Sequence, residues 1–281
     1  MINPNFGAYK LTMISFFQNK SVLITGGTEG IGKALVIALL AKGAKVATCG
    51  RNTDKLYRLQ TEYAGKALHT VVADVSNYDD CQYLINTTIE TFGGIDILIN
   101  NAGMTMRSLM EDTDVSVIRK LMDVNFFGTV NCTKLALPSI KERKGSIVGI
   151  SSVAGYRGLP SRSGYSASKF ALQGWLEAIR TELLDSGVNV MWISPGYTTS
   201  NIRNAALDQH GKPTGESHMD EDSMMSAEDV ASEVLKAIEK RKRSVVLTFT
   251  GKRAVFMNRF FPSLTDRMVR NFYFKDGQLV K

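Results

Sequence analysis

The sequence contains no apolar run of the roughly 18–20 residues that a membrane-spanning helix requires. Its first residues also lack the basic segment, long apolar stretch and small-residue cleavage site of a secretory signal. We therefore expect a cytoplasmic protein. Only three cysteines occur, and Cys49, Cys81 and Cys132 fit neither a C-x-x-C motif nor a Cys/His metal pattern. Their scarcity argues against a disulfide framework and a metal site, and we expect reduced thiols.

Histidine is equally scarce. His69, His210 and His218 are scattered and match no metal spacing, so we expect surface or loop residues rather than ligands or catalytic bases. No internal repeat or low-complexity tract occurs. With 281 residues, of which 44% are hydrophobic, the chain can build one sizeable α/β core and needs no separate second domain.

The net charge of +7 is concentrated near the end of the chain, where residues 240–281 hold eleven Lys/Arg and two Asp/Glu. Within this region, residues 253–274 interleave phenylalanines with arginines. One interpretation is a helix lying on an anionic membrane surface. We favour an element packed over the substrate cleft or against a neighbouring subunit, because Pro262 interrupts the helix. No nucleic-acid reading motif accompanies the charge, and we expect no nucleic-acid partner.

Apolar, β-rich runs alternate with helical stretches along the chain. Their nearly continuous apolar character suits strands buried on both faces, and the helices between them supply crossovers. This pattern predicts an α/β fold, a single doubly wound domain with a mainly parallel seven-stranded sheet. The candidate strands are Ser21–Thr25, Lys45–Gly50, Leu68–Ala73, Asp96–Asn100, Ser146–Ile150, Asn189–Ser194 and Ser244–Thr248.

We divide the chain into an N-terminal arm (1–19), a catalytic domain (20–250) and a basic helical extension (251–281). Within the catalytic domain, residues of about 197–226 are polar and glycine-rich, which fits either a mobile lid over a site or a surface loop. A stripe of Leu172, Trp175, Ile179 and Leu183 predicts a helix packed on the core, which we expect Gly187 to end.

A glycine-rich turn, Gly26–Gly32, follows the first candidate strand and precedes the helical pattern Lys33–Leu40. Glycines let a backbone approach a pyrophosphate closely, and a helix N-terminus offers it free N–H groups. The turn therefore predicts a dinucleotide phosphate site, although a glycine cluster alone also fits an ordinary tight turn.

Tyr165 and Lys169 are four residues apart, so on a helix they share one face. An ammonium beside a phenol favours the phenolate, and lowering the phenol pKa by about 2–3 units takes roughly 3–4 kcal/mol. The pair could thus move a proton to or from a substrate oxygen. An exposed helix can also carry such a pair without any chemistry.

Three further motifs accompany this pair in a fixed order. Thr25 begins a T-G-x-x-x-G-x-G pattern, Asn100–Gly103 reads N-N-A-G after a later strand, and Ser152 lies thirteen residues before Tyr165. Over about residues 20 to 200 the chain resembles the short-chain dehydrogenase/reductase family. The resemblance implies a nicotinamide cofactor and assembly as a homodimer or homotetramer.

The resemblance also implies a catalytic tetrad of Asn125, Ser152, Tyr165 and Lys169. Ser152 would hold the substrate oxygen, and Tyr165 would deliver the proton. Lys169 would lower the phenol pKa and bind the nicotinamide ribose, while Asn125 would bind a water that connects Lys169 to solvent. Ser152 could instead cap a turn, and Asn125 a helix.

The same resemblance assigns cofactor contacts along the chain. The glycine-rich turn would bind the pyrophosphate, and the dipeptide Asp74-Val75 at the end of the third strand would contact the adenine. The segment after the sixth strand would contact the carboxamide of the nicotinamide. Tyr165 and Lys169 would both take part in catalysis and contact the cofactor. The remaining cofactor-binding residues are Gly26, Thr28, Gly30, Ile31, Gly32, Arg51, Asp74, Val75, Asn101, Ala102, Gly103, Pro195, Gly196 and Thr198.

The choice of cofactor depends on the end of the second strand, which reads Cys49–Asn52. The acidic residue that grips the ribose diol of NAD is missing there, and Arg51 offers a planar donor fork suited to a 2′-phosphate. We therefore predict NADP(H), with NAD(H) not excluded. Glu29 argues against NADP(H), since a carboxylate at this position should repel the 2′-phosphate unless it pairs with Arg51.

The substrate is predicted only as a ketone or secondary alcohol, apolar or lipid-like. The basic extension and the segment Tyr156–Pro160 are similar to the branch that contains 3-ketosphinganine reductases and membrane-associated relatives. A non-catalytic nucleotide-binding regulatory or interaction protein on the same fold is the alternative to an oxidoreductase.

Overall fold

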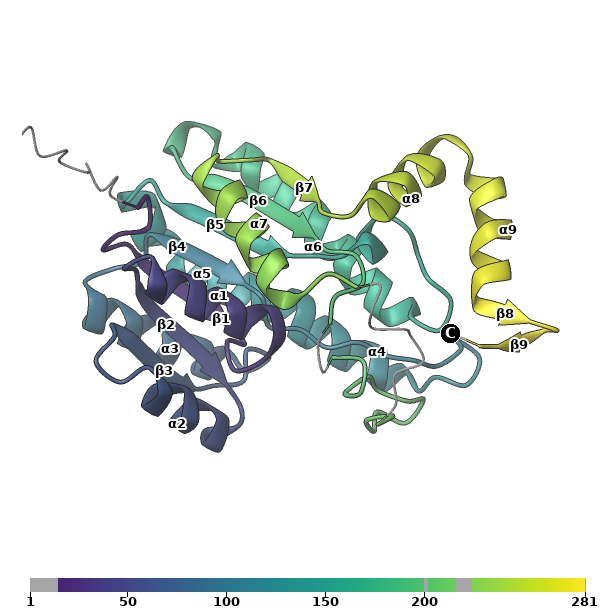
Figure 1. The fold of residues 1–281 in the computed structure, drawn as a ribbon, viewed down its shortest axis with the longest axis horizontal. Helices are drawn as coiled ribbons and strands as arrows, with labels where there is room; N and C mark the ends of the chain where they lie inside the picture. The colour runs from purple at the N-terminus through teal and green to yellow at the C-terminus, as the bar shows by residue number, and fades with distance from the viewer. Residues whose placement is uncertain (1–14, 200–201, 216–223, 281) are drawn as a thin grey trace, which may run out of the picture.

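Seven parallel strands form the central sheet, in the order β3-β2-β1-β4-β5-β6-β7 (Figure 1). The computed structural model describes residues 15–199, 202–215 and 224–280. The strand order reverses beside β1, which pairs with β2 on one side and β4 on the other, and open α/β sheets bind ligands at the carboxyl ends there. The strands are β1 (Ser21–Thr25), β2 (Lys45–Gly50), β3 (Leu68–Val72), β4 (Ile97–Asn100), β5 (Ser146–Ile150), β6 (Asn189–Ser194) and β7 (Ser244–Val246).

The predicted fold class is confirmed. β1, β2, β5 and β6 begin and end at the predicted residues. β3 is one residue shorter than predicted, β4 begins one residue later, and β7 ends two residues earlier. Just before β4, Asp96 bonds Ser21 twice: its backbone N–H donates to the Ser21 carbonyl at 2.9 Å, and its side chain accepts from the Ser21 backbone N–H at 2.8 Å.

Helices cover both faces of the sheet. α1 and α7 pack together over one face, while α3, α5 and α6 bury their apolar residues on the other (Figure 1). The helices are α1 (Gly30–Ala41), α2 (Thr53–Glu62), α3 (Tyr78–Phe92), α4 (Val115–Met122), α5 (Gly128–Glu142), α6 (Ser163–Glu182), α7 (Ala227–Glu239), α8 (Phe249–Phe260) and α9 (Pro262–Tyr273). Shorter turns are η1 (Asp123–Phe127), η2 (Val153–Gly155) and η3 (Leu184–Ser186).

The apolar stripe of α6 packs against the core as predicted, with Leu172 fully buried and Trp175 and Ile179 partly buried against the same cluster. The predicted end of the helix was wrong. α6 ends at Glu182, and the short turn η3 follows before Gly187 takes a left-handed φ of 74°. Gly187 thus closes η3, because a tight three-residue turn separates it from the helix.

The predicted N-terminal arm and substrate loop are only partly described. Phe17 of the arm is 2% exposed in the core, and residues 1–14 lie outside the described ranges. In the predicted loop, Leu207 exchanges backbone hydrogen bonds with Thr105 and Arg107 at 2.9 and 2.8 Å. These bonds anchor the described part of the loop to the body of the protein. Residues 216–223 of the predicted loop, which include the acidic run 220–222, lie outside the described residues.

The C-terminal extension folds into α8 and α9, which project beyond β7, followed by a hairpin of β8 (Phe274–Lys275) and β9 (Gln278–Leu279) (Figure 1). Pro262 is the first residue of α9, where the missing N–H is tolerated. Arg157 fastens both helices, because it bonds Asn258 at 2.9 Å and pairs with Asp266 at 2.6 Å. Within the described residues, none of the helices has the length and apolar character needed to cross a membrane.

Candidate active site

The glycine-rich turn after β1 has a shape that side chains would prevent. Gly26 and Gly30 adopt left-handed φ angles of 71° and 51°. At Gly32 an added Cβ would lie 2.1 Å from the Gly26 carbonyl oxygen and 2.5 Å from the amide nitrogen of Asn101. Only glycine fits this position, and the backbone between β1 and α1 is left bare on the side of the sheet where strands end.

Hydrogen bonds join this turn to the segment that follows β4. The Thr25 hydroxyl accepts from the backbone N–H groups of Asn101 and Ala102, each at 3.0 Å. The Asn101 amide donates to the carbonyls of Thr25 and Gly26, again at 3.0 Å. In the sequence, the glycine-rich turn and the segment Asn100–Gly103 were related only by their order along the chain. In the structure they form one platform at the point where the strand order reverses.

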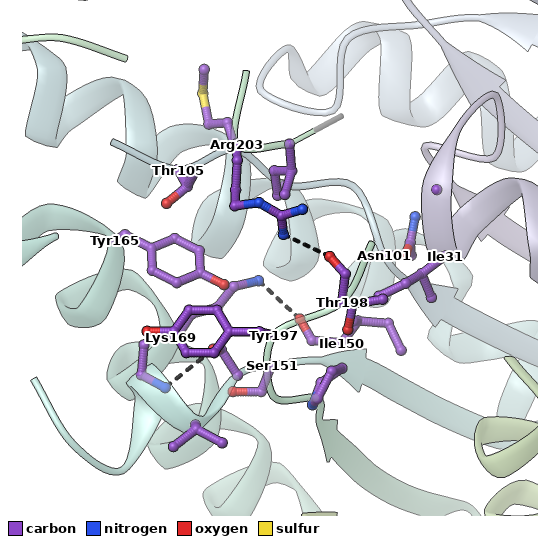
Figure 2. A pocket seen from close by; sticks show the side chains of 18 of the residues that line it. Ile31, Asn101, Thr105, Ile150, Ser151, Tyr165, Lys169, Tyr197, Thr198 and Arg203 are labelled. Carbon is purple, nitrogen blue, oxygen red and sulfur yellow. Dashed lines mark hydrogen bonds between the residues drawn. The ribbon is translucent and has the colours of Figure 1, made fainter. Parts of the chain in front are cut away.

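A cavity of about 1160 Å³ lies over this platform (Figure 2). Every residue predicted to bind the cofactor lines it. Its length, from the glycine-rich turn past Tyr165 and Lys169 to α8 and α9, and its bare glycine backbone fit a nicotinamide dinucleotide. Three members of the predicted tetrad also line it, namely Ser152, Tyr165 and Lys169, whereas Asn125 does not.

The end of β2 carries two ion pairs at the rim of this cavity. Arg51, which is 64% exposed, lies 3.7 Å from the carboxylate of Asp74. Glu29 pairs at 2.6 Å with Lys55 in the first turn of α2. From the sequence, only Arg51 is named as a possible partner for Glu29, and Lys55 is not identified. Finding it requires the fold, because the two residues are 26 positions apart.

Asp74 is held in its ionised form. Burial raises the pKa of its carboxyl, but the Ser76 hydroxyl and backbone N–H, both hydrogen-bonded to it, and the nearby Arg51 outweigh burial and lower it. A carboxylate fixed in this way can orient polar groups of a bound nucleotide.

Ser151 and Ser152, which follow β5, have different surroundings. The Ser151 hydroxyl is buried and accepts a hydrogen bond from Gln173 at 2.8 Å. Ser152 begins η2, where its hydroxyl accepts from the Ala154 backbone N–H at 3.1 Å. The Ser152 hydroxyl also lies close enough to Tyr165 to lower the phenol pKa. Of the two serines, Ser152 is thus the one that faces the reactive hydroxyl.

Burial raises the pKa of the Tyr165 phenol above its usual value. Ser152 and the positive charge of Arg162 act in the opposite direction but do not outweigh burial. The net depression that the Tyr/Lys spacing predicted is therefore wrong for this structure. The Lys169 ammonium lies 5.8 Å from the centre of the tyrosine ring, and helical spacing alone does not reveal how deeply the phenol is buried.

Lys169 is 5% exposed, and burial lowers its pKa to about 8. Its ammonium donates a hydrogen bond to the Ile150 carbonyl oxygen at 2.9 Å (Figure 2). At neutral pH the amine therefore still carries its charge in a largely desolvated position, where it interacts strongly with any polar group that enters the cavity.

Asn125 lies in η1, a π-helical turn between α4 and α5. Its amide oxygen accepts from the Met104 backbone N–H at 2.8 Å, and its amide nitrogen donates to the Met104 carbonyl and the Ser168 hydroxyl, each at 2.9 Å. Both donors are used inside the protein, so Asn125 fastens the segment after β4 to the helix of Tyr165 and Lys169. Its predicted contact with a water stays a prediction.

The far wall of the cavity comes from the C-terminal extension. Tyr273 of α9 is 3% exposed, and its hydroxyl lies 2.9 Å from that of Tyr197. Burial, together with the neighbouring Tyr197, raises the Tyr273 pKa far above its usual value. The remaining lining residues from α8 and α9 include Arg253, Ala254, Met257, Thr265, Met268, Val269 and Phe272. The sequence favours packing of this region over the substrate cleft or against a neighbouring subunit, and these residues do line the cavity.

The cysteines and histidines lie apart from this chemistry. The three cysteines are buried and free of disulfides. His210 is exposed and 3.1 Å from Asp114, His69 packs edge-on against Phe92, and His218 lies outside the described residues. In the described ranges, no three His, Cys, Asp or Glu residues come close enough together to hold a metal ion.

Comparison with known proteins agrees with the family resemblance seen in the sequence motifs. A family model described as short chain dehydrogenase matches residues 20–211. Dehydrogenase/reductase SDR family member 7B of Mus musculus is 37% identical over 263 residues, which cover 91% of this chain and 81% of that protein.

Solved structures match over most of the chain as well. A short chain dehydrogenase/reductase from Burkholderia phymatum, solved in complex with NAD, superposes with a TM-score of 0.77 at 23% identity, covering 88% of this chain and 95% of that one. A short-chain dehydrogenase/reductase of unknown function from Caenorhabditis elegans, solved with cofactor, gives a TM-score of 0.69 at 26% identity, covering 82% and 94%.

Proposed function

The chain belongs to the short-chain dehydrogenase family, and we propose that it transfers hydride between NADP(H) and an apolar ketone or secondary alcohol. The observation that carries this proposal is the arrangement of Ser152, Tyr165 and Lys169 on one cavity with the glycine-rich turn. Fold alone would not support a particular reaction, whereas a proton donor beside a nucleotide platform does.

The proposed chemistry needs few groups from the protein. A nicotinamide cofactor, when bound, supplies or accepts the hydride. The Ser152 hydroxyl would hold the substrate oxygen beside Tyr165, whose phenol would give a proton to that oxygen in reduction and take it back in oxidation. Lys169 would stabilise the phenolate formed when the proton leaves, because its charge lies nearby in a largely desolvated site.

The preference for NADP(H) rests on the charges around the end of β2. Arg51 and Lys55 both line the cavity there, and the two neighbouring carboxylates of Glu29 and Asp74 are already paired with them. The repulsion expected from Glu29 is thus reduced by Lys55. Two cations suit a 2′-phosphate, to which guanidinium groups bind through charge-assisted hydrogen bonds.

Arg51→Asp is expected to lower kcat/KM for NADPH by about 10- to 100-fold and to raise it for NADH, since one charge-assisted phosphate contact is replaced by repulsion. Steady-state rates with both cofactors measure this change. Lys42→Asp, an exposed substitution at the far end of α1, gives the same change in net charge and should leave the ratio unaltered. An unchanged ratio in Arg51→Asp would remove Arg51 from the proposed role.

A turnover screen of aliphatic, aromatic and steroidal ketones and alcohols with both cofactors tests the proposed reaction itself. An oxidoreductase should consume NADPH with at least one class. Tight NADPH binding without oxidation across the whole panel would favour the alternative, a nucleotide-binding regulatory protein.

We propose further that the protein assembles as a homodimer or homotetramer in the cytoplasm. Phe127 of η1 and Phe170 of α6 support this assembly, since they are 49% and 45% exposed on elements that pack together. A partner subunit would cover them. Light scattering should give a mass of two or four chains, and a single chain at micromolar concentration would contradict the assembly.

The outer surface of the C-terminal extension supports a peripheral contact with an anionic membrane. Phe249, Phe256, Phe260 and Phe261 are each more than half exposed. Exposed phenylalanines beside arginines suit the boundary between headgroups and acyl chains. Other residues of the same two helices line the cavity, so this contact would lie close to the cavity.

Phe260→Ser together with Phe261→Ser is expected to weaken binding to vesicles that contain phosphatidylserine by about 10-fold or more, because two buried rings contribute several kcal/mol. Sedimentation of the protein with vesicles measures it, and wild-type binding should fall as salt is added. Tyr57→Ser on α2 serves as the matched control, since Tyr57 is 72% exposed and remote in sequence. Equal binding of all three proteins would contradict a membrane contact through this surface.

A further inference from the structure

We propose that Arg162 binds an anionic group of the substrate, a carboxylate or a phosphate, while Tyr165 acts on the carbonyl of the same molecule. This inference rests on the proposed function and narrows its substrate class to ketones or alcohols that combine an apolar chain with a negative charge.

Arg162 lies immediately before α6 and lines the cavity three residues from Tyr165. One guanidinium nitrogen donates to the Thr105 hydroxyl at 3.2 Å, whereas the buried Nε has no hydrogen-bond partner among the described residues. Its positive charge lowers the pKa of the phenols of both Tyr165 and Tyr273. The cation therefore lies between the proton donor and the wall formed by α9.

Arg162 is partly buried, and a partly buried guanidinium usually has a carboxylate beside it, because an uncompensated charge is costly to desolvate. Arg157 follows this rule and pairs with Asp266. No Asp or Glu lies within 4.0 Å of Arg162 in the parts of the chain that the structure describes, although hydroxyl groups surround it. An anion brought by a ligand would supply the missing partner.

The rest of this end of the cavity defines the other half of the ligand. Apolar side chains predominate there, namely Leu159, Met257, Met268, Val269 and Phe272. Arg203, which is 7% exposed and donates to the Thr198 carbonyl at 2.7 Å, lines the cavity as well (Figure 2). A largely apolar cavity end with Arg162 in its lining suits an amphiphile rather than a neutral hydrocarbon ketone.

Arg162 is not the partner of the cofactor phosphates in this scheme. The pyrophosphate site is the bare backbone of the glycine-rich turn, and the positive charges proposed for a 2′-phosphate are Arg51 and Lys55. Arg162 instead neighbours Tyr165 and Tyr273, on the side of the cavity formed by the C-terminal extension.

Binding of compounds without a carbonyl tests the inference independently of turnover. Decanoate, decyl phosphate and decanol are titrated into the enzyme saturated with NADP⁺ by calorimetry. We expect one or both anions to bind at least about 10-fold more tightly than decanol, as one charge-assisted hydrogen bond provides. In Arg162→Leu this preference should disappear, while Arg162→Lys, which keeps the charge, should retain part of it. Equal affinity for anion and alcohol in the wild type would overturn the inference.

Arg259→Leu is the control, because Arg259 is exposed on α8, is not part of the cavity lining and changes the net charge by the same amount. It should keep the wild-type preference for anions. Loss of the preference in Arg259→Leu as well would mean that bulk charge, rather than Arg162, attracts the anion, and this result would also overturn the proposal.

Turnover separates recognition by Arg162 from an effect on the proton donor. With 4-oxodecanoate and its methyl ester, Arg162→Leu should lower kcat/KM for the acid by about 10- to 100-fold and leave that for the ester nearly unchanged. An equal loss with both ketones would assign Arg162 to tuning of Tyr165. If neither ketone is reduced by the wild type while decanoate still binds through Arg162, the proposed reaction fails and the anion site stands.

Discussion

Tyr165→Phe is expected to lower kcat by at least about 100-fold and up to about 10,000-fold, the range that one positioned acid or base contributes. The substitution keeps the ring and removes only the hydroxyl. The glycine-rich turn and the residues at the end of β2 do not depend on that hydroxyl, so the dissociation constant for NADPH should change little. Stopped-flow turnover and fluorescence titration of NADPH measure the two quantities.

Tyr83→Phe removes a phenol that is 62% exposed on α3 and should leave both quantities as in the wild type. A Tyr165→Phe enzyme that kept most of its turnover would show that the proton comes from another group. A variant that lost NADPH binding to the same degree would show that the loss of rate comes from the cofactor site.

Because the pKa of Tyr165 is raised, the rate should depend on pH differently in reduction and in oxidation. Because burial keeps the phenol protonated at neutral pH, reduction has its acid ready and should run at a level rate through that range. Oxidation needs the phenolate, and its rate should rise as the pH increases. Rate profiles in both directions test this, and parallel profiles would mean that bound cofactor changes the ionisation of the phenol.

Lys169→Met is expected to remove turnover and at the same time to stabilise the fold at neutral pH. In the folded protein the pKa of Lys169 is lowered from 10.5 to about 8, a penalty on the order of 3 kcal/mol on the charged amine. Loss of the hydrogen bond to the Ile150 carbonyl offsets about 1 kcal/mol. Urea unfolding at pH 7 should therefore show a variant that is more stable by about 2 kcal/mol.

The sign of the pH dependence follows from proton uptake. Between pH 8 and 10.5 the unfolded chain holds a proton on Lys169 that the folded chain has released, so wild-type stability from this residue rises with pH. Cys49, whose pKa is raised to about 12 by burial, acts in the opposite direction above pH 9 but is common to both proteins.

The difference between wild type and variant thus isolates Lys169, and the advantage of the variant should shrink as the pH approaches 10. Lys141→Met, at an exposed position of α5, should show no such trend. A constant difference across this pH range would mean that Lys169 does not carry a lowered pKa in the folded state.

The strands could be predicted because each is a short apolar run between turns, which is a local property. The end of α6 moved furthest, because η3 separates the helix from Gly187, whereas the boundaries of β3, β4 and β7 moved by one or two residues. The motifs at the ends of β1, β4 and β5 could be placed together in advance, since the carboxyl ends of parallel strands meet at one edge.

Other features depend on contacts between distant parts of the chain. The pairing of Glu29 with Lys55 follows from the position of α2 beside the glycine-rich turn, and the approach of Arg162 to Tyr273 follows from the position of α9 beside the start of α6. No local pattern contains this information. The ionisation of Tyr165 was mispredicted for a similar reason, because spacing on a helix gives the distance to Lys169 but not the loss of solvent around the phenol.

The separation of the proposed proton-transfer residues from the C-terminal wall of the cavity has an evolutionary consequence. The proposed proton-transfer residues lie just after β5 and on α6, whereas the far wall of the cavity is encoded after residue 248, in a segment held to the loops after β5 and β6 by contacts such as Arg157 with Asp266 and Tyr197 with Tyr273. Mutations in that segment can reshape the space for the substrate without disturbing the hydride-transfer machinery. Selection can therefore diversify which molecules descendants of this protein accept while their chemistry is inherited intact.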